Sequence, residues 1–302
     1  MKLSDNLTIV IPYYKKTFLD STLLSLENQT SQNFKVFIGD DGSPEDPRSI
    51  INSFQGTLSI YYKKFENNLG SNSLTAHWHR CINNAPKSQW IMILGDDDML
   101  SKNCVSNFYE KIDEVDFRKI RIIRFSSQII DVENKKISKV HKHQYIENST
   151  NFLFNKITGS ARSSLSEYIF YRPNLEKKGF KNFPLAWHSD DLALIEFSNY
   201  GDILSIGNSR VYIRSSTINI SGNKRFSKEK NLASYKFYKY LFINHQDILT
   251  AHRKAILISK LEKCVLNNRK NFFLITDISS LFLKNGDIWQ YLKFSKKFIF
   301  KR

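Results

Sequence analysis

Over its first 130 residues the chain alternates short, continuously apolar segments with segments whose apolar residues recur every three or four positions. The apolar segments cover residues 7–14, 34–42, 58–65, 89–94 and 120–131, and the periodic segments cover residues 18–29, 47–54, 73–85 and 102–115. Continuous apolar runs are typical of strands buried on both faces, and the periodic pattern is typical of amphipathic helices. Their alternation predicts an α/β fold with a mostly parallel sheet that helices cover on both faces.

Three of the predicted strands end in polar residues. Residues 12–14 (Pro-Tyr-Tyr), 40–43 (Asp-Asp-Gly-Ser) and 96–98 (Asp-Asp-Asp) follow the first, second and fourth strands. In open α/β sheets ligands bind outside the carboxyl ends of the strands, so we expect these three groups to share one edge of the sheet. Their convergence is a stronger indication of a ligand site than any one of them alone.

Asp96, Asp97 and Asp98 form what we call the acidic triplet. Mg²⁺ and Mn²⁺ prefer oxygen ligands and typically take one or two carboxylates together with phosphate oxygens, so the triplet suits a metal–diphosphate site. The alternative is a solvated turn that caps a helix, since Asp is favoured there. Asp40 and Asp41 have a similar alternative, because Asp-Gly is a strong turn signal, and residues 12–14 could serve packing alone.

A second acidic group, Asp190 and Asp191, opens a segment with the pattern of an amphipathic helix. We call it the acidic pair. A carboxylate within hydrogen-bonding distance of a sugar hydroxyl can act as a general base, whereas the alternative is a helix N-cap. The nearby His188 is a candidate metal ligand, although a single His is more often structural.

The chain is strongly basic, with a formal net charge of +16. Residues 228–302 hold 16 Lys and Arg against 5 Asp and Glu, in a pattern that predicts helices. Such an excess indicates an anionic partner, which can be nucleic acid, a membrane surface or a phosphate-bearing substrate. Basic segments with interspersed aromatic residues suit nucleic acid or a membrane interface, and a solvated helical face is the simplest alternative.

The cysteines and the lengths of the apolar runs indicate the kind of cellular compartment in which we expect the protein. Cys81, Cys104 and Cys264 are odd in number and widely spaced, which favours reduced, structural thiols and a reducing compartment. The first residues lack the apolar core of a signal peptide, since Asp5 interrupts it. No apolar run approaches the roughly 18 residues of a membrane span, so we expect none.

Taken in order, these motifs resemble the family 2 glycosyltransferases of the GT-A fold. The resemblance covers residues 7–201 and rests on a strand ending at Pro12, the Asp-Asp-Gly-Ser turn, an Asn-x-Gly stretch, the acidic triplet and the acidic pair. For the donor, the resemblance implies that Pro12 and Tyr14 flank a nucleotide base, that Asp40 contacts uracil with Asp41 beside it, and that Asn68 and Gly70 lie near the base and ribose. It also implies that Asp96 contacts the ribose and that Asp97 or Asp98 binds Mn²⁺ or Mg²⁺. For the acceptor, it implies that Asp191 is the general base and that Asp190 takes the place of the usual Glu.

The chain departs from the family pattern at three places. If Gly95 stands where the family has its first Asp, then Asp97 is the metal ligand; if the triplet itself is the Asp-x-Asp motif, the ligand is Asp98. His77 stands in the usual place of an Arg, which leaves the role of that Arg unfilled. The family's downstream His has no clear counterpart, and Arg214, Lys224 and Arg225 are either contacts for the diphosphate or members of a solvated basic loop.

The resemblance implies a metal-dependent, inverting transfer from a UDP-sugar to a hydroxyl of a glycan acceptor. The expected acceptor is linked to a polyprenyl diphosphate, in bacterial O-antigen, capsule or other surface-polysaccharide synthesis, with the enzyme peripheral at the inner face of the cytoplasmic membrane. Residues 1–223 would form the catalytic domain, divided into a nucleotide-binding half (1–130) and an acceptor-side half (131–223). Residues 224–302 would form a basic helical region that associates with the anionic membrane surface.

Two other classes of function compete with this interpretation. One is a nucleic-acid-binding protein that uses the basic C-terminal region, although no recognised nucleic-acid module is present and we expect no nucleic-acid partner. The other is a metal-dependent nucleotidyltransferase or phosphohydrolase, which also places Asp at strand ends.

Overall fold

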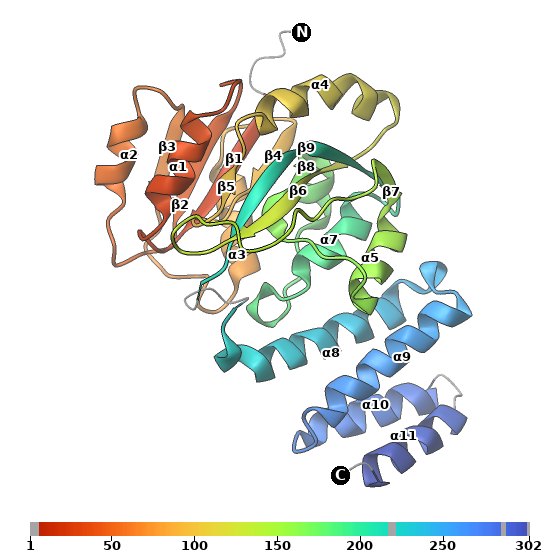
Figure 1. Ribbon diagram of the computed structural model, residues 1–302. Coiled ribbons are helices and arrows are strands. Elements are labelled where there is room, and N and C mark those ends of the chain that lie inside the picture. Colours follow the sequence, from red (N-terminus) through yellow and green to blue (C-terminus); the bar gives the residue numbers. More distant parts are fainter. Residues whose placement is uncertain (1–5, 217–221, 285–287, 301–302) are drawn as a thin grey trace. The chain divides into compact units, whose positions relative to one another are not determined.

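Figure 1 shows the protein as a computed structural model, which describes residues 6–216, 222–284 and 288–300. The chain divides into two compact units. The first, which we call the sheet unit, comprises Met1–Asn182 and Ser189–Gly222. The second, the helical unit, comprises Phe183–His188 and Asn223–Arg302.

The sheet unit is built on nine described strands. They are β1 (Leu7–Tyr13), β2 (Lys35–Asp40), β3 (Ile60–Lys64), β4 (Trp90–Ile93), β5 (Met99–Leu100), β6 (Ile122–Ile130), β7 (Ile146–Asn148), β8 (Tyr168–Tyr171) and β9 (Asp202–Arg214). Their order is β3-β2-β1-β4-β8-β6-β9-β5, and β7 pairs with β9. Since β1 lies between β2 and β4, the polar ends of these three parallel strands are neighbours, as the sequence predicts.

Helices cover both faces of this sheet (Figure 1). They are α1 (Leu19–Glu27), α2 (Arg48–Phe54), α3 (Leu74–Asn84), α4 (Cys104–Phe117), α5 (Ser149–Thr158), α6 (Arg172–Lys178) and α7 (Ser189–Phe197), with a 3-10 turn η1 (Leu165–Glu167). Successive strand side chains point to opposite faces. Accordingly Ile9 and Ile11 of β1 pack with α1, α2 and α4, whereas Val10 packs with α3, α5, α6 and α7. The predicted α/β fold with a doubly covered sheet is confirmed.

The parallel arrangement stops at β4. The short strand β8 runs antiparallel between β4 and β6, and β6 then pairs in parallel with β9. Seen over the whole sheet, β1, β2, β3, β4, β6 and β9 share one direction, and β5, β7 and β8 run against it. The fifth predicted strand is therefore present as β6, but it is separated from the fourth by a strand from much later in the chain.

The helical unit confirms the predicted helical C-terminal region. Its helices are α8 (Ser227–Asn244), α9 (Ala251–Leu266), α10 (Phe272–Lys284) and α11 (Ile288–Phe300), with 3-10 turns η2 (Pro184–Ala186), η3 (Lys224–Phe226) and η4 (Gln246–Ile248). Its buried apolar side chains include Phe237, Leu241, Leu257, Leu261, Leu274 and Ile278. These residues recur at helical spacing in α8, α9 and α10, so each of these helices buries one apolar face within the unit.

Two further observations concern the thiols and the helix lengths. Cys81, Cys104 and Cys264 are all buried and free of disulfide bonds. Among residues 6–216, 222–284 and 288–300, no helix is long and apolar enough to cross a membrane.

Candidate active site

The polar ends of β1, β2 and β4 meet at the carboxyl edge of the sheet. Just past β1, the backbone N–H groups of Tyr14 and Lys15 each donate to Asp96 Oδ2 over 3.0 Å. Ser43 Oγ, in the loop after β2, donates to the carbonyl oxygen of Tyr14 over 2.7 Å. The structure thus brings the three predicted polar groups together, with the Tyr14 ring 39% exposed at this edge.

The acidic triplet is held by two segments from much later in the chain. Asp98 is only 7% exposed, and Ser166 Oγ donates to its Oδ2 over 2.6 Å while the backbone N–H of Arg214 donates to its Oδ1 over 3.0 Å. Burial raises the pKa of Asp98 to about 8 and that of Asp96 to about 6, and the negative charge of Asp97 adds to both shifts. The charged forms of these two carboxyl groups are therefore disfavoured, and a nearby cation would favour them.

The donor set suits a metal ion that arrives with a diphosphate. Among the described residues no group of three or more His, Cys, Asp or Glu is arranged to hold a metal by itself. Both oxygens of Asp98 already accept hydrogen bonds, whereas Asp97 is half-buried at the edge. A Cβ on Gly95 would lie 2.9 Å from Asp97 Oδ1, so the glycine allows this carboxylate to fold back. One carboxylate with phosphate oxygens and water is a usual Mg²⁺ coordination.

Arg214, for which the sequence leaves open a contact with the diphosphate or a place in a solvated basic loop, is buried and holds neighbouring loops. It is 2% exposed, and its guanidinium donates to the carbonyl oxygens of Asp97 (2.9 Å) and Asp131 (2.7 Å) and to Asn134 Oδ1 (2.6 Å). The guanidinium also lies 4.2 Å from the centre of the Phe18 ring. Its planar set of donors is therefore used to fix the loops beside the acidic triplet.

Asp40, predicted to contact uracil, is fully buried at the end of β2. Ser43 N–H donates to its Oδ1 and the Tyr62 hydroxyl donates to its Oδ2, both over 2.7 Å. Burial and this hydrogen bond raise the pKa of Tyr62, which keeps the hydroxyl protonated as the donor. Pro12 lies within β1, opposite Gly39 of β2. The contact between Asp40 and a base stays a prediction.

Asp41 is buried within a ring of donors from the loop after β3. The N–H groups of Leu69 and Gly70 donate to its two oxygens over 2.8 Å each, and Arg80 forms an ion pair with Oδ1. A Cβ on Gly70 would overlap Asp41 Oδ2, so only glycine permits this approach. Asn68, the first residue of the Asn-x-Gly motif, accepts a hydrogen bond at its Oδ1 from the backbone N–H of Ser71 over 2.9 Å.

Arg80 is a residue that the motif comparison misses. The resemblance leads us to expect the family's Arg at position 77, but Arg80 lies one helical turn later on the same face of α3 and reaches Asp41 from there. Its guanidinium also donates to the carbonyl oxygen of Asn67 over 2.8 Å and lies 4.1 Å from the centre of the Phe65 ring. Positions 77 and 80 are three residues apart and therefore lie on the same face of a helix, so an Arg at either position can reach the same partner.

His77 is buried beside this ion pair and is expected to lower stability in acid. Its Nδ1 accepts from Arg80 Nε over 3.0 Å, and burial lowers the pKa of His77 to about 4, although Asp41 partly opposes the shift. Between about pH 6.5 and pH 4 the unfolded chain binds a proton at this residue that the folded chain does not. The free energy of unfolding therefore decreases by up to about 3 kcal/mol as the pH is lowered through this range. Urea unfolding of His77→Gln should show a smaller loss over this range, and an unchanged loss would contradict the assignment.

The acidic pair begins α7. Asp191 is 8% exposed and forms an ion pair with Lys156 of α5, while Asp190 is half-buried in the same first turn. Burial alone lowers the pKa of Lys156, but the carboxylates of Asp191 and Asp190 outweigh it and the pKa is raised. Lys156 is thus a charged partner of the predicted base, and nothing in the sequence pattern points to it.

Residues 163–166 link the acidic pair to the acidic triplet. Ser163 Oγ accepts from Lys156 Nζ over 2.6 Å. Three residues later, Ser166 Oγ accepts from the Gly95 N–H over 3.1 Å and donates to Asp98. A single four-residue segment therefore contacts both the partner of the predicted base and the predicted donor site.

The remaining predicted residues belong to the helical unit. His188 stacks on Phe237 with ring centres 4.6 Å apart, and its Nε2 lies 2.9 Å from Ser234 Oγ, an arrangement that favours a structural role. Arg225 is exposed in η3, and the Lys224 side chain lies outside the described part of the chain. The backbone at Leu185, Ala186 and His188 has positive φ values of 60°, 51° and 71°, directly before the acidic pair.

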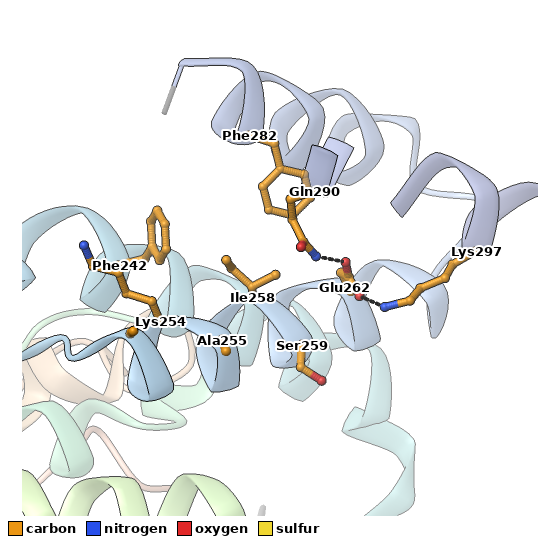
Figure 2. Close-up of a pocket in the computed structure, with 10 residues that line it drawn as sticks. Phe242, Lys254, Ala255, Ile258, Ser259, Glu262, Phe282, Gln290 and Lys297 are labelled. Carbon is orange, nitrogen blue, oxygen red and sulfur yellow. Dashed lines mark hydrogen bonds and ion pairs between the residues drawn. The ribbon is translucent and has the colours of Figure 1, made fainter. Parts of the chain in front are cut away.

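Two hollows lined by described residues can be compared with the predicted site. One, of about 690 Å³, opens at the carboxyl edge of the sheet between the loops after β1 and β2, beside Lys16, Thr17 and Glu45. The other, of about 590 Å³, lies wholly among α8, α9, α10 and α11, and Figure 2 shows its lining. Of these two hollows, the first lies beside the loops that carry Tyr14 and Ser43, whereas the second is lined by residues of the helical unit alone.

Comparison with solved structures agrees with this fold. The chain is similar to Staphylococcus aureus TarS 1–349 in complex with UDP (TM-score 0.57, 13% identity, 98% of this chain and 92% of that chain). It is equally similar to the complex of TarS 1–349 with UDP-GlcNAc (TM-score 0.58, 12% identity, 97% and 91%). At this identity the likeness shows the GT-A fold alone.

Comparison with curated sequences gives the family. The chain is 24% identical over 201 residues to the uncharacterized glycosyltransferase YfnE of Bacillus subtilis (65% of this chain, 48% of that protein). It is 22% identical over 116 residues to a GalNAc(5)-diNAcBac-PP-undecaprenol beta-1,3-glucosyltransferase of Campylobacter jejuni (36% and 35%), so it spans about half or less of the curated relatives it matches. The profile of glycosyl transferase family 2 matches residues 8–168, more than half of the chain. The chain belongs to glycosyl transferase family 2.

Proposed function

We propose that the protein transfers a sugar from a UDP-sugar to a hydroxyl group of a glycan, with inversion at the anomeric carbon. The observation that carries the proposal is the meeting of Asp40, Asp41 and the acidic triplet at the carboxyl edge of three adjacent parallel strands. This edge is where α/β sheets bind nucleotides. The family match covers this part of the chain and ends before the acidic pair.

On the donor side, the strand-end loops bind and orient the nucleotide. The exposed Tyr14 ring offers a face for the base, and Asp96, fixed by the N–H groups after β1, lies where the ribose is expected. Asp97 is the proposed ligand of Mn²⁺ or Mg²⁺, because it is half-buried at the edge of the sheet whereas Asp98 is buried. When bound, the metal would offset negative charge that develops on the leaving diphosphate.

On the acceptor side, the acidic pair supplies the general base. A carboxylate of the pair takes the proton from the acceptor hydroxyl as that oxygen attacks the anomeric carbon from the face opposite the diphosphate. The family resemblance implies that Asp191 is the base. We propose Asp190 for this role instead, because it is the more accessible of the two and Asp191 is paired with Lys156. Direct attack in one displacement inverts the configuration.

The relatives support the choice of substrates. The TarS complexes contain UDP and UDP-GlcNAc, which favours a UDP-linked donor, and the Campylobacter relative is named for an acceptor carried on undecaprenol. We therefore propose a lipid-linked acceptor in bacterial surface-polysaccharide synthesis, with the enzyme peripheral at the cytoplasmic face of the membrane. The basic helical unit supports the choice of an anionic surface.

Metal-dependent binding of UDP is the direct test. UDP with Mn²⁺ is expected to raise the melting temperature by several degrees, since a ligand at about 100 times its Kd stabilises by about 2.7 kcal/mol. Asp97→Asn should remove the part that depends on Mn²⁺, whereas Asp116→Asn, an exposed change on α4, should not. Thermal shifts with UDP, ADP and GDP, each with and without Mn²⁺, measure both effects.

Two results would contradict the proposal. If Asp98→Asn removes the metal dependence and Asp97→Asn does not, the ligand assignment is wrong although the function can hold. If UDP-sugar is consumed at the same rate with and without a sugar acceptor, the protein is a hydrolase.

A further inference from the structure

Helix α11 has one side fixed against the rest of the helical unit. Glu262 of α9 is 3% exposed and accepts from Gln290 Nε2 (2.6 Å) and Lys297 Nζ (2.7 Å). Figure 2 shows both side chains pointing to Glu262. On the same side, Phe294 is 1% exposed, with its ring centre 6.0 Å from that of Phe282. These contacts establish which side of α11 faces inward.

The opposite side of α11 is also apolar, yet it is exposed. Ile288, Leu292 and Ile299 are separated by four and seven residues, so they share one side of the helix, and they are 60%, 51% and 67% exposed. Trp289, beside them, is 76% exposed. We call these four residues the outer face. A surface helix normally has a polar outer side, so a second apolar side indicates a partner.

The charges on α11 indicate what kind of partner. Its described residues include Lys293, Lys296 and Lys297 but no Asp or Glu, and Lys293 and Lys296 are exposed. Clustered lysines beside Trp, Leu and Ile are the composition of helices that lie in the interface of an anionic bilayer. The long lysine stems can follow the apolar surface while the ammonium groups reach the headgroups.

We propose that the outer face of α11 docks the protein on an anionic lipid surface. A second copy of the chain fits less well, because a symmetric contact would bring Lys293 and Lys296 towards the same lysines of the other copy. Nucleic acid fits less well, because three of the four outer-face residues are aliphatic and only Trp289 could stack on a base. The inference rests on the proposed function in one respect: a lipid-linked acceptor would explain why the protein docks on a membrane. Docking itself requires neither the sugar donor nor the acceptor.

Vesicle sedimentation of the full chain tests the proposal. The protein should bind vesicles of phosphatidylcholine mixed with phosphatidylglycerol and bind phosphatidylcholine alone much more weakly. The double variant W289S/L292S should lose about tenfold or more in partitioning, because it removes two apolar side chains from the interface. K293Q/K296Q should lose about tenfold on the anionic vesicles only. Phe117→Ser, at an 88% exposed aromatic of α4, is the matched control and should bind as the original chain does.

Other outcomes would overturn the proposal. Equal binding of the original chain and W289S/L292S, or failure of the original chain to bind anionic vesicles, excludes docking through this face. Loss of a concentration-dependent dimer in W289S/L292S would assign the face to a second copy, and competition by single-stranded DNA would assign it to nucleic acid. Because the outer-face side chains are exposed, the variant should keep its circular dichroism spectrum and its UDP-dependent thermal shift, so a failure of docking is distinguishable from a failure of the proposed function.

Discussion

Asp190→Asn is expected to lower the rate of sugar transfer by about 10²- to 10⁴-fold, the usual contribution of a general base. Asparagine keeps the shape of the side chain but does not accept a proton. UDP binding and the free energy of unfolding should stay close to those of the original chain, because Asp190 is half-buried in the first turn of α7. The measurements are initial rates of UDP release with acceptor, a UDP titration and urea unfolding.

Asp191→Asn should also lower the rate of transfer, but because it destabilises the fold, which unfolding measurements should show. It removes the carboxylate that pairs with Lys156, and leaving a buried charge without its partner typically costs about 3–5 kcal/mol. The double variant K156M/D191L is the control: apolar replacement of both partners should recover most of that stability and, because Asp190 stays in place, much of the transfer as well. If Asp190→Asn retains near-normal turnover while Asp191→Asn is inactive but stable, Asp191 is the base.

Arg80→Met is expected to destabilise the protein by about 3 kcal/mol or more and to weaken UDP binding by about tenfold. The substitution leaves the Asp41 carboxylate buried without its guanidinium partner. The loop that carries Asn68 and Gly70 is held by the same Asp41, so its position should be lost together with the ion pair. Urea unfolding and isothermal titration with UDP measure the two effects.

A second ion pair nearby gives the matched control for Arg80→Met. Arg48 pairs with Asp46 in the loop after β2, but the two side chains are 70% and 51% exposed. Exposed pairs contribute little, so Arg48→Met should cost less than about 1 kcal/mol. Equal effects of the two substitutions would show that burial of Asp41 does not carry the difference.

The part of the fold that the sequence predicts is the part built from local patterns. β1 to β4 and the helices between them follow from apolar runs and helical periodicity, and each strand pairs with another from the same 100 residues. β8 could not be placed in this way. It is only four residues long, and it inserts beside β4, about 80 residues earlier in the chain, through contacts that no local pattern encodes.

The same distinction applies to the site. The strand-end carboxylates were predicted because the topology of a parallel sheet brings strand ends together. Arg80 and Lys156 were not, because each acts through a contact with a residue far along the chain, Asp41 and Asp191 respectively. No sequence pattern distinguishes a buried lysine in a helix from a solvated one. The ion-pair partner distinguishes them, and that partner is known only from the packing of the helices.

Residues 163–166 have a consequence for how the catalytic region can be rebuilt. One way to change the proposed acceptor is to exchange the proposed acceptor-side half and keep the proposed donor side. Here Ser166 holds Asp98 and the backbone of Gly95, while Ser163 holds Lys156. A chimera joined before this segment would import a foreign support for the acidic triplet along with the new acceptor-side half. The segment should therefore travel with the donor half, and a junction placed after β8 respects both sets of contacts.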